Sequence, residues 1–234
     1  GATRDRTIPS AHVVLKYQAG AFAGSPVQPE CMCAFAMYDL QNVDVTGYDV
    51  VSNRPKVAAY RAPGAPIASF AAESAIDDLA LKLGMDPIAL REKNAAKAGT
   101  KTVYGVTFPE IGFEQVLTAA KNHPHWKAPL GPNQGRGFAT GFWFNIGGES
   151  SASVFVNEDG SVNVVSGSPD IGGSRASMAM MAAEVLGIPV DSVRPIIGDT
   201  ASVGFTHVTG GSRVTYATGM ATIQAAEKVI EQLK

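Results

Sequence analysis

The chain has 234 residues and a formal net charge of −2; 45% of its residues are hydrophobic and only 17% are charged. This length can bury a sizeable core, as one large domain or two small ones, and the low charge content suggests that other chains or domains cover part of the surface. Acidic and basic residues are interspersed, so there is no electrostatic basis for binding nucleic acid or an anionic membrane surface.

Two further observations bear on location. No apolar run reaches the length of a membrane span, and no signal peptide is recognisable. Cys31 and Cys33 are too close for an easy disulfide and do not make a metal site by themselves. The simplest interpretation is two free thiols in a reducing compartment, and we therefore expect a cytoplasmic protein.

The first fifty residues carry strand patterns. Residues 11–18 have the β-branched and aromatic content of a strand, and residues 43–51 alternate well enough for another. Residues 30–40 fit either a short helix or a buried strand, because their periodicity does not distinguish the two.

Residues 53–66 form the junction on which the functional argument depends. The short apolar run 57–60 predicts a strand; Arg61 and a Pro-Gly-Ala-Pro turn follow, and small and apolar residues then recur at helical spacing from Ile67 to Leu83. Arg61 is therefore expected at a strand-to-helix junction, where helix amides and a guanidinium can converge on an anion. Taken alone, an ordinary loop with a solvated arginine is the better interpretation.

The chain then passes through two more predicted helices. Gly84 is suited to end the first helix, and Asp86 followed by Pro87 is a typical start for a short helix ending near Asn94. Another helix is expected over 112–122. The polar, proline-containing connection after it predicts a division into two domains, residues 1–130 and 131–234.

The second domain reads as β-rich. Strands are expected at 137–146, at 150–157 with 161–167 as a hairpin around Asp159-Gly160, and at 193–197. Two glycine turns, 170–174 and 209–212, each lead into a helix, one over 175–186 and one reaching the C-terminus. The small residues of the last helix (Ala217, Gly219, Ala221, Ala225 and Ala226) would allow close packing against a sheet. Each glycine turn alone is more often a plain turn than an anion site.

Six separated segments keep the order and spacing of motifs in a known family: 60–66 (Tyr-Arg-Ala-Pro-Gly-Ala-Pro), 70–73, 82–94, 159–162, 169–173 (Pro-Asp-Ile-Gly-Gly) and 209–212 (Thr-Gly-Gly-Ser). Together they resemble the molybdopterin-binding subunit of the xanthine dehydrogenase/aldehyde oxidase family, and the likeness covers nearly the whole chain. It implies an α+β fold of mixed sheets with packed helices, in two subdomains of a molybdenum-cofactor-binding domain.

The resemblance also implies a cofactor site. The positions that match the family's cofactor-binding residues are Arg61, Gly172, Gly173, Gly211 and Ser212. The position of Gly173 is often glutamine in that family, where its amide bonds an oxo ligand of the metal, and the glycine here leaves that contact in doubt. The implied cofactor is molybdenum–molybdopterin, with the cytosine dinucleotide form left open.

The substrate residues implied by the resemblance are Pro63, Phe142 and Trp143. Pro63 replaces the aromatic residue of purine-oxidising members, and Pro29 stands where those members orient the substrate with an arginine, which makes xanthine a poor candidate. Ala62 replaces the cysteine that carries copper in carbon monoxide dehydrogenases. For Phe142, alternation with Phe138 and Phe144 into a core is an equally good interpretation.

The remaining candidate residues give weaker evidence of a functional role. The histidines at 12, 123, 125 and 207 lack zinc-site spacing; His207, near the second glycine turn, is better read as a surface or structural residue than as a cofactor contact. Glu73 is expected to be an exposed or capping carboxylate, since nothing near it in sequence makes it a base.

The family's catalytic glutamate and its upstream Gly-Gly-Phe-Gly loop are both missing, and its subunit is roughly three times longer. We therefore expect a middle portion of that subunit, a fragment or a split polypeptide, that is not active alone. With iron–sulfur and FAD partners on other chains or domains, it would contribute to hydroxylating an aldehyde or N-heterocyclic C–H with water-derived oxygen. The alternatives are a non-catalytic structural or assembly module, and an unrelated nucleotide-binding protein, which lacks a phosphate-loop lysine motif.

Overall fold

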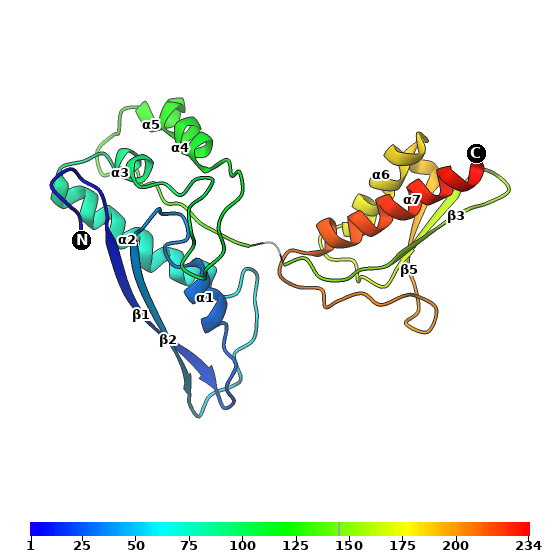
Figure 1. The fold of residues 1–234 in the computed structure, drawn as a ribbon, viewed down its shortest axis with the longest axis horizontal. Helices are drawn as coiled ribbons and strands as arrows, with labels where there is room; N and C mark the ends of the chain where they lie inside the picture. Colours follow the sequence, from blue (N-terminus) through cyan, green and yellow to red (C-terminus); the bar gives the residue numbers. More distant parts are fainter. Residues whose placement is uncertain (145) are drawn as a thin grey trace. The chain divides into compact units, whose positions relative to one another are not determined.

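A computed structural model describes residues 1–144 and 146–234, and contacts divide it into two compact units, Gly1–Trp143 and Phe144–Lys234 (Figure 1). Each unit mixes helices with an open sheet, so the expected α+β class is confirmed. The predicted division into subdomains 1–130 and 131–234 stays a prediction. Asn145, which falls within one expected strand, lies outside the described residues.

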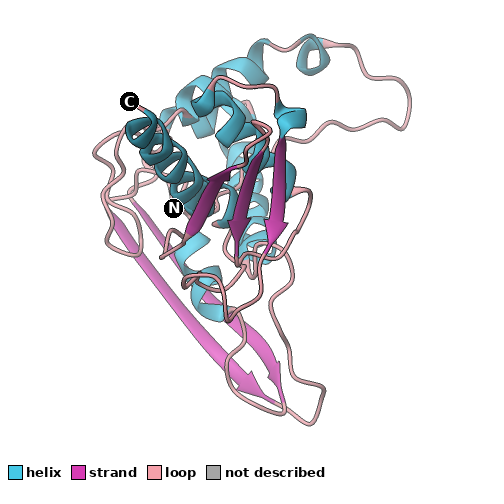
Figure 2. Ribbon diagram, turned by 90° about the vertical axis from the view of Figure 1, so that its right-hand side faces the viewer, coloured by secondary structure: helices cyan, strands magenta, loops and turns pink. Residues whose placement is uncertain are grey.

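The first unit begins with a long two-stranded parallel ribbon, which Figure 2 shows from the side. Strand β1 (Ser10–Gly20) pairs with β2 (Asn42–Val51), as both strand patterns predicted. A parallel pair needs a crossover, and this one contains helix α1 (Val27–Cys33), which resolves the open choice for residues 30–40 in favour of a helix over their first part. Helix α1 lies directly on β2, because a Cβ at Gly47 would stand 2.5 Å from Cys31 Sγ.

Two consecutive helices form the body of this unit, and their predicted ends are confirmed. Helix α2 (Ala65–Leu83) ends at Gly84, which adopts the left-handed conformation that favours glycine. Helix α3 (Pro87–Lys93) begins after Asp86, whose carboxylate accepts a hydrogen bond from Ala89 N at 2.9 Å. Side chains from both helices pack with Ile8 and Tyr38 into one buried cluster.

A second cluster lies under helix α4 (Phe113–Asn122), the helix predicted over 112–122. Phe113 and Leu117 face inward at a spacing of four residues and meet Ala95. The short helix α5 (Pro124–Lys127) follows within the polar, proline-containing connection. Phe138 packs on the same cluster from outside any helix or strand.

Two expected strands are wrong. Residues 57–60 run as an irregular segment in which Val57 N donates to Ala19 O at 2.9 Å, and Tyr60 is 90% exposed. Residues 137–144 are also irregular, and they are held by contacts such as the hydrogen bond from Thr140 N to Glu73. Neither segment lies in the register of a neighbouring strand, and strand composition without such a partner does not make a sheet.

The second unit contains a three-stranded sheet in the order β3 (Ala152–Val156), β4 (Val162–Ser166), β5 (Val193–Ile197). Strands β3 and β4 form the predicted antiparallel hairpin, and β5 runs parallel to β4. Helix α6 (Ser174–Leu186) connects β4 to β5 and packs Met178, Ala179 and Ala182 against Val162 and Val164. It ends at Gly187, again in the left-handed conformation.

The C-terminal helix α7 (Gly219–Leu233) lies beside α6 and β3 (Figure 1). Its small residues do permit close packing, since a Cβ at Gly219 would stand 2.7 Å from Met181 Sδ on α6. The expected helix start near residue 212 is a π-helix, Val214–Thr218, that passes directly into α7. The remaining turn is a 3₁₀ segment, Val190–Ser192. Among the helices that the structure describes, none combines the length and apolarity that crossing a membrane requires.

Candidate functional site

The two predicted glycine turns come together in the second unit. They line one cavity of about 370 Å³, to which the first turn and the start of α6 contribute Ile171 and Ser174. The second turn and the residues directly after it contribute the rest of the lining: Thr209, Gly210, Ser212, Arg213, Val214 and Thr215. The lining offers hydroxyl groups, main-chain groups and one guanidinium, and none of these residues is a carboxylate. Such a surface suits a polar, negatively charged ligand.

Backbone geometry explains the glycines in these turns. Gly172, Gly173 and Gly211 have φ values of 65°, 83° and 67°, in the left-handed region where a side chain is strained. Ser212, at φ 60°, adopts the same conformation without being glycine. At Gly211 space is also limiting, because a Cβ there would stand 2.4 Å from Ile146 Cδ1. At Gly173 a Cβ would meet nothing within 4 Å.

The first turn is capped by its own aspartate. Asp170 Oδ1 accepts from Arg175 N at 3.1 Å, and Asp170 Oδ2 accepts from Arg175 Nε at 3.0 Å. The hydrogen bond from the Arg175 amide lowers the pKa of Asp170. One of the amides at the start of α6 is therefore already satisfied, and Ile171 N donates to Ser174 Oγ at 3.3 Å.

Arg213 is the residue of this site that the sequence did not single out. It is buried, and its guanidinium donates to the carbonyl oxygens of Gly147 (2.7 Å), His207 (2.9 Å) and Glu149 (2.6 Å), and to Ser150 Oγ (2.6 Å). Its partners are almost all main-chain atoms, which leave no signal in the sequence. His207 takes part only through its main chain in these bonds, in keeping with a structural role.

In the first unit, the turn that carries Arg61 is strained and closely packed. Arg61 and Ala62 have φ values of 36° and 50°, which non-glycine residues rarely adopt, and Arg61 is exposed. A Cβ at Gly64 would stand 2.6 Å from Pro26 O, so the turn lies directly on the start of α1. The predicted position of Arg61 just ahead of a helix is correct, although an irregular segment and not a strand precedes it.

Glu30, on α1, is a buried carboxylate beside this turn. Its N and Cβ atoms are the other close neighbours of Gly64, at 2.9 Å and 2.8 Å from the position of an added Cβ. The side chain is 2% exposed, and its Oε2 has no hydrogen-bond partner among the described residues. Burial raises the pKa of Glu30 to about 7.

Two of the three expected substrate residues line a second cavity. Phe142 and Trp143 border a space of about 200 Å³ in the first unit, together with apolar residues such as Met37, Phe108 and Phe113. Phe142 also packs against Phe108, with ring centroids 5.6 Å apart. Pro63 is half-buried in the Arg61 turn and is not among the described residues that line this cavity.

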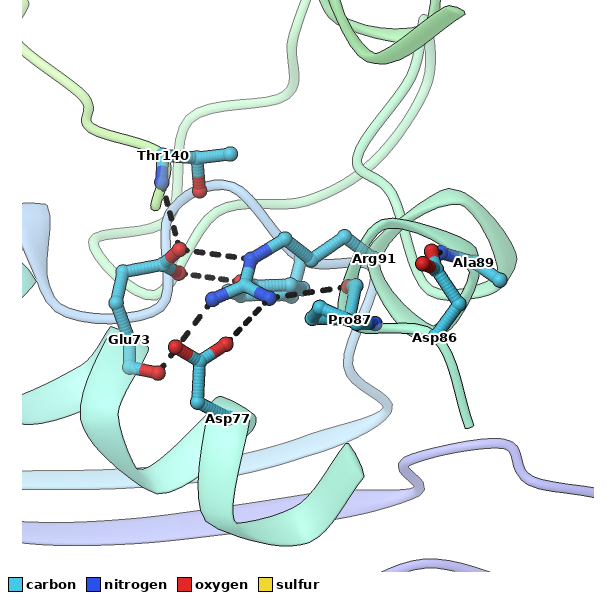
Figure 3. Close-up of polar contacts among 8 residues, drawn as sticks. Glu73, Asp77, Asp86, Pro87, Ala89, Arg91 and Thr140 are labelled. Carbon is cyan, nitrogen blue, oxygen red and sulfur yellow. Dashed lines mark hydrogen bonds and ion pairs between the residues drawn. The ribbon is translucent and has the colours of Figure 1, made fainter. Parts of the chain in front are cut away.

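The expectation that Glu73 is exposed or capping is wrong. Figure 3 shows Glu73 inside the first unit, where Oε2 accepts from Arg91 Nε at 2.9 Å and from Thr140 N at 2.6 Å. Oε1 accepts from the hydroxyl of Tyr38. Arg91 also pairs with Asp77 at 2.8 Å and donates to Pro87 O at 3.0 Å. This network holds the irregular segment that leads to Phe142.

The candidate residues thus fall into two sets. Arg61, Pro63, Phe142 and Trp143 belong to the first unit, and the two glycine turns belong to the second. Within the described part of the chain, no group of His, Cys, Asp and Glu side chains is arranged to hold a metal ion directly.

Comparisons with known proteins fit this description. Molybdopterin cofactor-binding domain families match residues 1–95 and 109–234. The xanthine dehydrogenase molybdenum-binding subunit of Escherichia coli O157:H7 is 33% identical over 76% of this chain and 26% of its own length. The aldehyde oxidoreductase of Megalodesulfovibrio gigas is 31% identical over 84% of this chain and 23% of its own length.

A solved structure agrees at the level of the fold. The crystal structure of the aldehyde oxidoreductase from Desulfovibrio desulfuricans superposes with a TM-score of 0.87 and 27% identity, over 99% of this chain and 27% of that chain. The chain therefore spans about a quarter of the length of the relatives it matches.

Proposed function

This chain belongs to the molybdopterin cofactor-binding domains of the xanthine dehydrogenase/aldehyde oxidoreductase family, and from that premise we propose that its two glycine turns and Arg61 hold the cofactor in a molybdenum hydroxylase. The proposed contacts are Arg61, Gly172, Gly173, Gly211 and Ser212. In this role the protein binds and orients the cofactor, which when bound supplies the redox chemistry.

The observation that supports the proposal most directly is the shared cavity in the second unit. Its volume of about 370 Å³ lies within the range of about 300–1,000 Å³ typical of cofactor sites. Main-chain groups at Gly210 and Ser212, the hydroxyls of Ser174 and Thr209, and the positive charge of Arg213 suit a polar ligand with a phosphate. The left-handed turns allow the backbone to approach such a ligand closely.

The first unit would supply the remaining charge and the substrate wall. Arg61 stands exposed on a strained turn, a conformation that persists where the surrounding structure holds it and that often marks a functional position. Phe142 and Trp143 would form an apolar wall of the substrate channel. Pro63, in the Arg61 turn, is the third proposed substrate residue. Pro29 and Pro63 provide neither charge nor an aromatic face, which argues against a purine substrate.

We propose accordingly that the complete enzyme hydroxylates an aldehyde or an N-heterocyclic C–H with oxygen from water, and passes two electrons to iron–sulfur and flavin partners. The cofactor is molybdenum–molybdopterin, its cytosine dinucleotide form included among the candidates. The proposal includes a cytoplasmic location, which rests on the free thiols of Cys31 and Cys33.

The test is the molybdenum and pterin content of the complete protein purified from cells. Arg61→Ala is expected to lower both several-fold relative to wild type, because it removes a charge that binds the cofactor's anionic groups. Arg54→Ala, an exposed arginine earlier in the same connection, is the matched control and should leave both contents unchanged. Unchanged metal and pterin in Arg61→Ala would contradict the assignment.

A second function has one observation in its favour. Gly173 replaces the glutamine that the family often carries, and the site could be that of a structural module which kept the fold without the chemistry. Wild-type protein isolated without molybdenum or pterin would support this alternative, and stoichiometric cofactor would exclude it.

A further inference from the structure

A chain of hydrogen bonds connects the two glycine turns inside the second unit. It begins at Arg213, directly after the second turn, whose Nη2 donates to Ser150 Oγ at 2.6 Å. Ser150 Oγ lies 3.1 Å from Thr218 Oγ1, and Thr218 Oγ1 lies 3.0 Å from Ser168 Oγ. Ser168 stands two residues ahead of Asp170, the cap of the first turn.

The direction of the bonds is consistent along the chain. A hydroxyl group offers one proton and two acceptor positions. Because Arg213 donates to Ser150, the Ser150 proton is available for Thr218, and the Thr218 proton for Ser168. All three hydroxyls can then be satisfied together, which matters because Thr218 is fully buried and Ser168 is 4% exposed.

The same arginine also holds the segment beside the second turn. Its bonds to the carbonyl oxygens of Gly147 and Glu149 hold the irregular segment 147–149 in place. Its bond to His207 O holds the segment that leads to Thr209. Arg213 has no carboxylate partner among the described residues, so its charge is balanced only by carbonyl and hydroxyl dipoles. A buried arginine used in this way fixes geometry and keeps the wall of the cavity positive.

We propose that this chain, from Arg213 through Ser150 and Thr218 to Ser168, locks the two glycine turns into one preformed cavity, and that Arg213 and Thr218 are positioning residues for the ligand held there. Neither residue needs to touch the ligand. The inference rests on the proposed function for the identity of the ligand, but the locking of the turns is a property of the protein itself.

Thr218→Val tests the locking, because valine keeps the shape of threonine and removes the hydroxyl that joins Ser150 to Ser168. Amide hydrogen exchange of the complete protein, freed of cofactor, is measured at residues 168–173 and 207–212. Exchange at both turns is expected to rise about tenfold or more in Thr218→Val, and Thr218→Ser, which keeps the hydroxyl, should restore wild-type protection.

The matched control is Thr222→Val, four residues further along the chain in α7. Thr222 is equally buried, but its hydroxyl donates to Thr218 O at 2.9 Å within the helix and reaches neither turn. Equal exchange at the turns in the two valine variants, or no rise in Thr218→Val, would overturn the proposal. If Thr218→Val does not fold, Ser168→Ala removes the last hydroxyl of the chain and is judged by the same criterion.

Cofactor content separates this proposal from the function on which it rests. If the turns are locked and bind molybdopterin, Thr218→Val should also lower molybdenum content several-fold while Thr222→Val does not. Loosened turns in a protein whose wild type carries no molybdenum would support the locking and contradict the proposed function. Protected turns in Thr218→Val, with molybdenum present, would contradict the locking alone.

Discussion

Glu73 and Arg91 form an ion pair inside the first unit, with 2.9 Å between Oε2 and Nε and with the Arg91 side chain fully buried. Glu73→Ala would leave that guanidinium without its buried partner, with only the half-exposed Asp77 carboxylate remaining, and would also break the bond to Thr140 N. Removing one member of a buried pair typically costs about 3 kcal/mol or more. We expect a loss of this size in the free energy of unfolding of the first unit, measured in urea. Both tryptophans of the chain, Trp126 and Trp143, lie in this unit and report its unfolding by fluorescence.

The control for this prediction is a surface pair in the same unit. Glu92 pairs with Lys121, whose side chain is 46% exposed. Glu92→Ala should cost less than about 1 kcal/mol, as exposed pairs do. Equal losses in the two variants would show that burial is not what makes the Glu73 pair important.

Glu30 gives the first unit a predictable pH dependence. Burial raises its pKa to about 7, above the ordinary value of about 4.3, so the folded state binds this proton more tightly than the unfolded state. Protonated Glu30 therefore makes its whole contribution to the free energy of unfolding below pH about 4. That contribution is lost as the pH rises toward 7. Glutamine at position 30 cannot ionise. As the pH rises from 4 to 8, the free energy of unfolding of Glu30→Gln should therefore increase relative to that of wild type by on the order of 1–3 kcal/mol.

Urea midpoints at several pH values, read by tryptophan fluorescence, measure this difference. Glu114→Gln changes an exposed glutamate in the same unit and should leave the wild-type pH profile intact. A Glu30→Gln profile parallel to that of wild type would show that the carboxylate is not protonated on folding.

Gly211 and Gly173 share a left-handed backbone but differ in the space around them. Alanine at Gly173 meets nothing within 4 Å and should cost only the conformational strain of about 1–2 kcal/mol. Alanine at Gly211 would also collide with Ile146, whose Cδ1 lies 2.4 Å from the added Cβ, and overpacking adds about 1–3 kcal/mol. Thermal unfolding followed by circular dichroism should therefore rank Gly211→Ala clearly below Gly173→Ala, and the reverse order would contradict the geometry of the second turn.

Cys33 should be slow to react with thiol reagents. Burial raises the pKa of its thiol to about 11, and only the thiolate is nucleophilic. At pH 8 this reduces the thiolate roughly a hundredfold relative to an exposed cysteine. In Cys31→Ser protein, labelling with a disulfide reagent should be slow under native conditions and fast in denaturant. Fast labelling of the native variant would mean that α1 opens readily.

Local signals in the sequence predicted local structure well. Gly84 and Gly187 end helices and Asp86 begins one because each acts on backbone atoms within four residues of itself. The hairpin around Gly160 is equally local. The strands expected at 57–60 and 137–146 are absent from the described residues of those ranges, because a strand also needs a partner and composition carries no information about one.

At the candidate site, too, local features were predicted from the sequence and long-range contacts were not. Glycine spacing indicated both turns, and family resemblance indicated that they act together. The buried network of Glu73 could not be predicted, because its main partner lies 18 residues away and is brought close only by the packing of α2 on α3. Arg213 was missed because its partners are carbonyl oxygens, which every residue type supplies.

The π-helix at Val214–Thr218 sets the angle of Arg213 about the axis of α7. A π-turn holds one residue more than the α-helical turn it replaces, and each α-helical residue advances the chain by about 100°. Regular α-helical geometry over 214–218 with all residues kept would rotate Arg213 by about that angle relative to Thr222 and Ala226, which are buried in the interior. Deleting one residue from 214–217 along with this change would bring Arg213 back to its present angle. The π-helical turn thus fixes the rotation between its two ends. Helix α7 keeps its packing in the interior, while the Arg213 guanidinium stays directed at the backbone carbonyl oxygens that it binds.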